Sequence, residues 1–218
     1  MSTDAPAAAA PPPSPPPVEP VAPPVLELLG VTVRTTADEY DEGLAGATLT
    51  LRPGELCLVR LEADAPRVPL ADAACGVIDP DGGTVRFGGT DWGRMGHRRS
   101  ARDRGRVGRT FAGAGWVNNL DVDENVLLAQ RHHTRRPDAD LRAEAAALAA
   151  AFGLPNGLPA GRPSRAGRAD LARAALVRAF MGRPALLLLE RPEVGLPLDA
   201  MAALTAAVES ARGRGAAV

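Results

Sequence analysis

The hydrophobic pattern of the first half of the chain is typical of short β-strands. Apolar residues dominate Val25–Val33 and Ala47–Leu61, and Gly83–Trp92 has the character of a further short strand after a glycine-rich turn. Short runs of this kind, bounded by glycine, proline and aspartate, are the usual signal for strands joined by turns. We therefore expect a small antiparallel lobe built from Val25–Val33, Ala47–Leu51 and Thr84–Phe87.

The second half of the chain is dominated by helical spacing. Asp140–Phe152 and Ala169–Met181 each place alanine, leucine and phenylalanine on one stripe, and Gly153 ends the first of these helices. A last helix is expected over about Leu198–Arg212. These patterns predict a helical subdomain within about Asp121–Gly167.

One continuous apolar run stands apart from the helices. Ala185–Glu190 reads Ala-Leu-Leu-Leu-Leu-Glu, directly after a proline. A strand that is apolar at every position is covered on both faces, which indicates a parallel sheet between layers of helices. We predict an α/β sandwich in which Leu56–Val59 and Leu186–Leu189 are the central buried strands.

The N-terminal segment has a different composition from the rest. Ten of the residues in Met1–Pro24 are proline and six are alanine, and only Asp4 and Glu19 are charged. Such a segment buries too little surface to offset the entropy of ordering it. We expect a disordered, polyproline-like tail over residues 1–24 and one folded domain over residues 25–218.

Charge and cysteine content exclude several classes of protein. The net charge is -1 and aromatic residues make up 3% of the chain, so a nucleic-acid-binding protein is not expected. Two cysteines form neither a disulfide framework nor a zinc site. All 25 residues counted as lysine plus arginine are arginine, so any chemistry that requires a lysine is ruled out.

Five segments along the chain together carry a family resemblance. In order they are LELLGVTV from Leu26, TLTLRPGELCLV from Thr48, ACGVIDPDGGTVRFGG from Ala74, VGRTFAGAGWVNNLDVDENVLL from Val107 and ARAALVRAFMGRPALLLLERPEVGL from Ala172. In this order and spacing they resemble the ATP-binding cassette of ABC transporters over Val25–Val218. The resemblance implies a P-loop NTPase-like α/β fold with a parallel core sheet, a small antiparallel β lobe and a helical subdomain.

The resemblance also implies which residues occupy the positions of a nucleotide site for ATP and Mg²⁺. Leu61–Pro69 corresponds to the phosphate-binding loop, and Arg67 stands where the family has its lysine. Glu190 occupies the position of the Walker B aspartate, and Tyr40 could supply the aromatic ring that stacks on the base. Arg67, Glu190 and Tyr40 are therefore the candidate nucleotide-binding residues, and no catalytic or resident metal-binding residue is assigned.

The chain departs from the family pattern at the positions that carry the chemistry. Arg191 replaces the catalytic glutamate and cannot accept a proton from water. Ala112 replaces the Q-loop glutamine, and Ala166–Asp170 reads AGRAD in place of the signature motif LSGGQ. The family's last strand and switch histidine would follow Val218, so either the sequence is truncated there or the domain lacks both. We expect ATP binding and hydrolysis to be impaired or lost.

The resemblance implies a nucleotide-binding subunit of an ABC-type membrane transporter, degenerate in its ATP chemistry. It would work with a transmembrane permease subunit and a second cassette subunit, in a homodimer or heterodimer, at the cytoplasmic face of the cell membrane. Two alternatives remain. One is a non-transport scaffold or regulatory protein on the same fold. The other is an active ABC ATPase with atypical motifs, against which the absence of lysine argues.

Deleting Met1–Pro24 should leave the folded domain intact. Because this segment is expected to bury no core, the melting temperature should change by no more than about one degree. Differential scanning calorimetry of the full and shortened chains measures this directly. A loss of several degrees would show that the tail docks on the domain.

Overall fold

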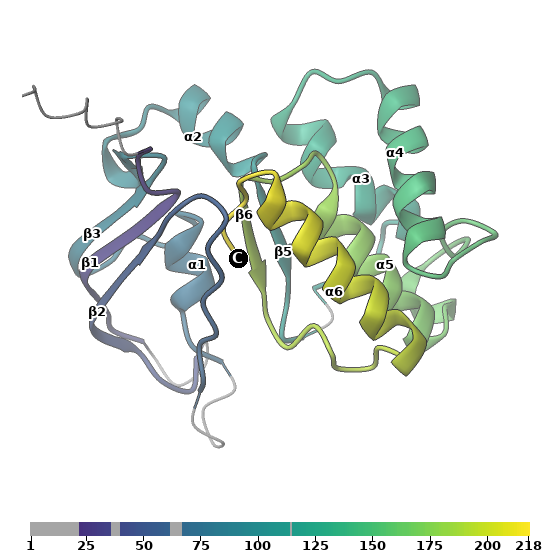
Figure 1. The fold of residues 1–218 in the computed structure, drawn as a ribbon, viewed down its shortest axis with the longest axis horizontal. Coiled ribbons are helices and arrows are strands. Elements are labelled where there is room, and N and C mark those ends of the chain that lie inside the picture. Colours follow the sequence, from purple (N-terminus) through teal and green to yellow (C-terminus); the bar gives the residue numbers. More distant parts are fainter. Residues whose placement is uncertain (1–21, 36–39, 62–66, 114) are drawn as a thin grey trace, which may run out of the picture.

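A computed structural model describes residues 22–35, 40–61, 67–113 and 115–218, and Figure 1 shows how their elements are arranged. The prediction of a disordered tail over residues 1–24 falls almost entirely outside the described residues. Most of the candidate phosphate-binding loop, residues 62–66, also lies outside them.

The N-terminal lobe is a four-stranded antiparallel sheet with the strand order β2-β1-β3-β4. Strand β1 (Leu26–Val33) lies in the middle, between β2 (Leu44–Leu51) and β3 (Gly82–Phe87), and β4 (Thr90–Asp91) extends the edge. Alternate apolar residues of β1 point into one core, where Leu28 and Val31 are fully buried. The prediction of a small antiparallel lobe is confirmed, with β2 beginning three residues earlier than expected.

A parallel pair of strands forms the second sheet. Strand β5 (Val107–Thr110) runs beside β6 (Leu186–Leu189) with Val107 opposite Leu186 and Thr110 opposite Leu189. Helix α5 (Arg168–Phe180) packs closely on β5: a Cβ atom added to Gly108 would lie 1.8 Å from the carbonyl oxygen of Ala179. This contact leaves no room for any side chain at position 108.

Strand β6 lies between two hydrophobic cores. Leu186 belongs to the core of the antiparallel lobe, and Leu187 belongs to the core formed by the helices. Successive side chains of a strand point to opposite faces, so a strand between two cores is apolar at every position. The uninterrupted leucine run of β6 fits this position. The prediction that Leu186–Leu189 is a strand is confirmed, and Leu186 and Leu187 are buried while Leu188 and Leu189 are partly buried. In the described residues it belongs to a two-stranded sheet, with one isolated bridge from Leu186 to Ala217 on its other side, so its predicted central place stays a prediction.

Helices cover the remaining faces, with α3, α4, α5 and α6 gathered on one side of the parallel strands (Figure 1). Short helix α1 (Leu70–Ala74) and α2 (His97–Arg104) lie on the side of the antiparallel lobe. The helical side consists of α3 (Val122–His133), α4 (Asp138–Ala151), α5 (Arg168–Phe180) and α6 (Leu198–Gly213), with 3-10 turns at Trp92–Arg94 and Pro163–Arg165. The three helices predicted from apolar spacing are present within two residues of their expected ends.

The prediction of a buried strand over Leu56–Val59 is wrong. The segment is not a strand: Leu56, Leu58 and Val59 are exposed, with Leu58 89% accessible, and only Cys57 is half-buried. Among the described residues, the backbone hydrogen bond of this segment is the one that the N–H of Cys57 donates to Val218, and the preceding Glu55 accepts one from Val218. A strand needs a neighbour along its length to satisfy its backbone groups, and the described residues provide one only at the beginning of this segment.

A buried glutamine joins three elements on the helical side. The Nε2 atom of Gln130 in α3 donates to the carbonyl oxygen of Gly105, at 3.0 Å, and to that of Met181, at 3.4 Å. These carbonyl groups lie just past the ends of α2 and α5. Because helix ends leave carbonyl groups without partners inside the helix, the glutamine amide satisfies two groups that would otherwise be buried unpaired.

Replacing Gln130 with leucine should therefore destabilise the domain. The loss of both hydrogen bonds should lower the free energy of unfolding by about 1–3 kcal/mol. Arg131→Leu in the same helix is a suitable control, because its exposed pair with Asp138 should contribute less than about 1 kcal/mol. Urea denaturation of the two variants compares them, and equal effects would contradict the role assigned to the glutamine.

Candidate functional site

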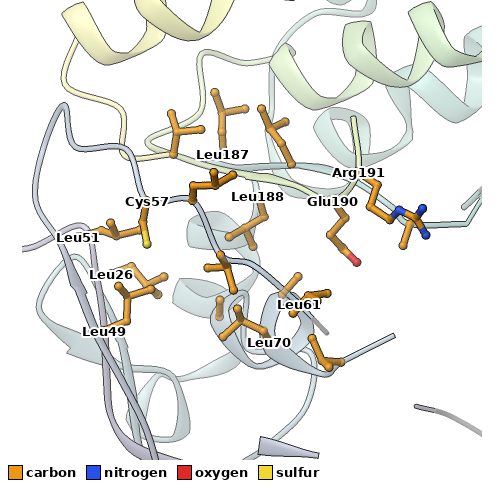
Figure 2. Close-up of a pocket in the computed structure, with 18 residues that line it drawn as sticks. Leu26, Leu49, Leu51, Cys57, Leu61, Leu70, Leu187, Leu188, Glu190 and Arg191 are labelled. Carbon is orange, nitrogen blue, oxygen red and sulfur yellow. The ribbon is translucent and has the colours of Figure 1, made fainter. Parts of the chain in front are cut away.

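A cleft lies between the antiparallel lobe and strand β6, at the carboxyl ends of the two parallel strands. Its volume is about 440 Å³, and Figure 2 shows the leucines of both walls with Glu190 and Arg191 at one end. In α/β folds this edge of the sheet is where ligands bind. The charged residues at this edge are Asp72 of α1, Arg109 of β5 and Glu190, which follows β6.

Arg109 is the charged centre of this region. From β5, its Nε donates to Oε1 of Glu190 at 2.6 Å. Its Nη1 and Nη2 donate to the two carboxylate oxygens of Asp72 in α1, at 2.6 and 3.2 Å. The bidentate geometry with Asp72 is the one in which a guanidinium binds a carboxylate most strongly.

The pairing register explains how Arg109 reaches Glu190. Arg109 lies opposite Leu188, and Glu190 follows Leu188 by two positions on the neighbouring chain segment. Residues two apart in an extended segment share a face, so both side chains project toward α1. The side chains of Arg109, Asp72 and Glu190 are only 13%, 18% and 26% exposed.

Both members of the Arg109–Asp72 pair are held in their charged forms. Burial alone would raise the pKa of Asp72, but the hydrogen bonds and positive charge of Arg109, with a further hydrogen bond from Tyr40, bring that pKa below its usual value. Burial would lower the pKa of Arg109, but its hydrogen bonds to Asp72 and Glu190 and their charges raise it instead. The site therefore contains two carboxylates that share one internal cation.

Tyr40 and Asp41 attach the loop before β2 to this cluster. The hydroxyl group of Tyr40 donates to Oδ2 of Asp72 at 2.9 Å. Next to it, Asp41 forms an ion pair with Arg67, with Nη2 and Oδ1 2.9 Å apart, and accepts a hydrogen bond from the backbone N–H of Arg67. Of the three candidate residues, Tyr40 and Glu190 meet through Asp72 and Arg109, whereas the guanidinium of Arg67 is held by Asp41.

A second arginine packs against aromatic rings beside Arg109. The guanidinium carbons of Arg109 and Arg178 lie 4.5 and 5.0 Å from the ring centre of Phe111, and that of Arg178 lies 4.6 Å from the ring centre of Trp116. Arg178 Nη1 donates to the carbonyl oxygen of Gly115 at 2.7 Å. Burial, with a smaller effect of the charge on Arg109, lowers the pKa of Arg178 to about 10.

Arg191 adopts a backbone conformation that is unusual for a residue with a side chain. Its φ angle is 44°, in the left-handed region, and the residue is exposed. Figure 2 shows its side chain beside Glu190, pointing away from the leucines of the cleft. Arginine at this position places a positive charge there and cannot accept a proton from water.

The described carboxylates do not fit a bound Mg²⁺. Mg²⁺ prefers carboxylate and other oxygen ligands, but Glu190, which lines the cleft, and the neighbouring Asp72 are both bound to Arg109. Among the described residues there is no group of three or more histidine, cysteine or acidic side chains that could hold a metal ion. Pro69, which precedes α1, has no N–H to offer a phosphate.

Sequence reasoning missed Asp72, Arg109 and Arg178 as members of the site. A signal for the first two was present, because each is a charged residue inside a short element that is otherwise small or apolar. A buried charge requires a partner, so such positions indicate an internal ion pair. Which residues are the partners could not be read from the sequence.

No helix in the described part of the chain is both long enough and apolar enough to cross a membrane. No family model matches the chain. The structure resembles that of an ATP-binding subunit of an ABC transporter, with a TM-score of 0.71 and 20% identity over 88% of this chain and 76% of the other. It also resembles an ATP-binding cassette bound to ADP and Pi, with a TM-score of 0.74 and 16% identity over 88% and 85% of the two chains. At these identities the likeness shows the fold, and the predicted α/β cassette architecture is confirmed.

Sequence relatives lead to the same family. The methionine import ATP-binding protein MetN of Mesorhizobium japonicum is 31% identical over 66% of this chain and 39% of its own length. The phosphonates import protein PhnC of Alcaligenes faecalis is 27% identical, and 59% of its length is matched, so this chain spans less than two thirds of these two relatives. The lipoprotein-releasing system protein LolD 1 of Rhodospirillum rubrum is 30% identical over 80% of this chain and 77% of its own length. The chain therefore belongs to the family of ABC transporter ATP-binding subunits.

Proposed function

We propose that this chain is a cassette subunit of an ABC-type transport complex in which ATP binding and hydrolysis are lost or nearly lost. The observation that carries the proposal is the guanidinium of Arg109 bound to both Glu190 and Asp72. Arg109, a cation of the chain itself, is bound to Glu190, which stands at the position of the family's Walker B aspartate. Glu190 is thus paired with a cation of the chain itself, without nucleotide.

The residues around Arg109 support the same proposal. Arg67, at the position of the family lysine, is bound to Asp41 rather than free to meet a phosphate. Arg191 stands in place of the family's general base, and its guanidinium cannot take a proton from water. Loss of the phosphate cradle and of the base removes most of the electrostatic stabilisation that drives phosphoryl transfer.

We further propose that residues 25–218 act as one cassette domain with a structural role in the complex. Its partners would be a transmembrane permease subunit and a second cassette subunit, at the cytoplasmic face of the membrane. The support is the family itself, whose relatives are named for methionine import and lipoprotein release. Pull-down of the chain with the products of neighbouring permease and cassette genes tests this role.

Isothermal titration calorimetry with Mg-ATP should detect no binding up to about 1 mM nucleotide, and the chain should hydrolyse ATP no faster than a blank. The R. rubrum relative, which is named an ATP-binding protein, serves as the positive control. Arg191→Glu alone should restore neither property, because a new base would have no bound nucleotide to serve. Mg²⁺-dependent binding by the native chain, or turnover by Arg191→Glu, would overturn the proposal.

A matched pair of loop variants tests the specific part played by Arg109. Replacing Leu61–Pro69 with a glycine-rich, lysine-bearing loop should supply backbone N–H groups and an ammonium for phosphates. With Arg109 present, ATP should bind this variant equally well with and without Mg²⁺, because Glu190 remains paired. Adding Arg109→Met should make the binding Mg²⁺-dependent. Mg²⁺-dependent binding by the first variant would contradict the blocking role of Arg109.

In the native chain, Arg109→Met should lower the free energy of unfolding by roughly 2–4 kcal/mol at pH 7, because it leaves two carboxylates close together without a cation. Arg99→Met is the control. Its half-exposed pair with Asp103 should contribute less than about 1 kcal/mol. Urea denaturation of both variants and of the native chain gives the comparison, and equal losses would contradict the assignment.

The effect of Arg109→Met should also depend on pH in a definite direction. The pKa of Asp72 in the folded state lies below its unfolded value of about 3.9. The stabilisation is therefore complete above that pH and is lost as the pH falls through the folded-state pKa. The unfolding free energies of the native chain and of Arg109→Met should converge below about pH 4. A constant difference down to pH 2 would contradict the ion pair.

A further inference from the structure

A second cavity lies where the parallel strands begin, at the opposite end of β5 and β6 from Glu190. Its volume is about 520 Å³. Arg106 directly precedes β5, Ala185 directly precedes β6, and Ala216 precedes Ala217, which bridges to β6; the first three of these residues line the cavity. Because parallel strands begin at the same edge of a sheet, segments far apart in the sequence meet here.

Three arginines line this cavity, and each lies just before one of these segments enters the sheet. Arg106 is directly before β5, Arg183 is three residues before β6, and Arg214 is three residues before Ala217. No acidic residue from the described part of the chain lines the cavity. A concave surface that carries one sign of charge concentrates ions of the opposite sign. The cavity is therefore suited to an anion.

The positive charge of the cavity is poorly balanced by the described residues. Oδ1 of Asp103 lies 3.8 Å from Nη1 of Arg106, which is beyond hydrogen-bond distance. The same carboxylate also pairs with Arg99 and Arg102, at 3.4 and 3.6 Å. Arg183 forms no ion pair with any residue that the structure describes. One carboxylate is thus shared by three arginines, and the charge of the cavity is left mostly uncompensated.

The hydrogen-bond donors of these arginines are also largely available. Each guanidinium has five N–H donors. Within the described ranges, Arg183 donates to no partner, and Nη1 of Arg214 donates to Oγ of Ser210 at 2.7 Å. Arg106 lies over the ring of Phe87, with 5.4 Å between the guanidinium carbon and the ring centre. This stacking holds one planar donor group in place before any ligand binds.

The backbone of Arg183 is unusual for a residue with a side chain. Its φ angle is 51°, in the left-handed region, and its side chain is exposed. Residues with a Cβ atom are uncommon in this region, whereas glycine adopts it without strain. A strained residue whose side chain has no partner among the described residues motivates a role for that side chain in binding.

We propose that this cavity binds a phosphate monoester, with Arg106, Arg183 and Arg214 donating to the phosphate oxygens. Guanidinium groups bind phosphate through paired, charge-assisted hydrogen bonds, and the terminal oxygens of a monoester can accept from more than one arginine. The volume is within the range of sites for small organic molecules. Pro53 and Pro184 in the lining offer apolar contacts to the organic group of the ester.

This site is separate from the cleft at Glu190 and does not depend on nucleotide chemistry. Its lining contains no carboxylate from the described residues that could hold Mg²⁺. Mg-ATP is a poor ligand for it, because Mg²⁺ occupies terminal phosphate oxygens that the arginines would bind. The outcome of the Mg-ATP titration therefore leaves this proposal unchanged.

Isothermal titration calorimetry with phenyl phosphate, in the absence of Mg²⁺, tests the site. The native chain should bind one equivalent with a dissociation constant below about 1 mM. Arg183→Gln should weaken binding at least about fivefold, because charge-assisted hydrogen bonds to the phosphate are lost. Arg135→Gln is the matched control, since Arg135 is likewise exposed, has no partner in the described ranges and does not line the cavity.

Arg183→Gly separates a role in binding from a role in folding. Glycine adopts the left-handed conformation without strain, so the melting temperature should stay unchanged or rise. Binding of phenyl phosphate should nevertheless fall as far as in Arg183→Gln. A loss of binding accompanied by a loss of several degrees in melting temperature would contradict the proposal, because the arginine would then act through the structure.

Vesicles distinguish a soluble ester from a lipid headgroup of the same chemistry. Cosedimentation with phosphatidic acid but not with phosphatidylcholine, reduced by Arg183→Gln, would assign the site to headgroups. Binding of phenyl phosphate without cosedimentation would assign it to soluble esters. The proposal would be overturned if the native chain bound neither probe. Equal weakening by Arg135→Gln would also overturn it, because that result would indicate non-specific attraction of anions to the surface.

Discussion

The guanidinium of Arg109 is the interaction on which the arrangement of the cleft depends. It binds Asp72 of α1 and Glu190 at the end of β6 while its own backbone belongs to β5. Tyr40 binds the same aspartate, so the loop before β2 is attached as well. Removing the cation would leave two partly buried carboxylates close together without it.

The ion-pair cluster gives the proposed loss of nucleotide chemistry a physical basis within a cassette fold. A bound Mg²⁺ would bring positive charge to the carboxylates of a nucleotide site. Here a guanidinium of the chain itself is bound to Asp72 and Glu190. Arg109 and Arg178 both lie against the ring of Phe111. A chain whose lysine and arginine residues are all arginine can build such a cluster, because the planar guanidinium stacks on aromatic rings and also binds carboxylates.

The cleft also has an apolar part. Its walls share backbone hydrogen bonds with Ala217 and Val218 at one end, and leucines of both walls line the cavity. Glu190 and Arg191 lie at the other end (Figure 2). The charged groups and the apolar lining thus occupy different parts of the cleft.

The sequence by itself determined the elements whose patterns are local. Spacing and run length of the apolar residues predict the helices α4, α5 and α6, the antiparallel lobe and the leucine strand β6. A helix or a strand covered on both faces has a characteristic pattern of apolar residues that is visible in a short stretch of sequence. The order and spacing of five sequence segments also indicated the ATP-binding cassette family. Only the tertiary structure decided the rest. Leu56–Val59 has a strand-like composition but is not a strand here, since its neighbour is present only at Val218. Arg109 binds partners 37 and 81 positions away, and such pairings depend on how the sheets and α1 meet in space, which no local pattern encodes.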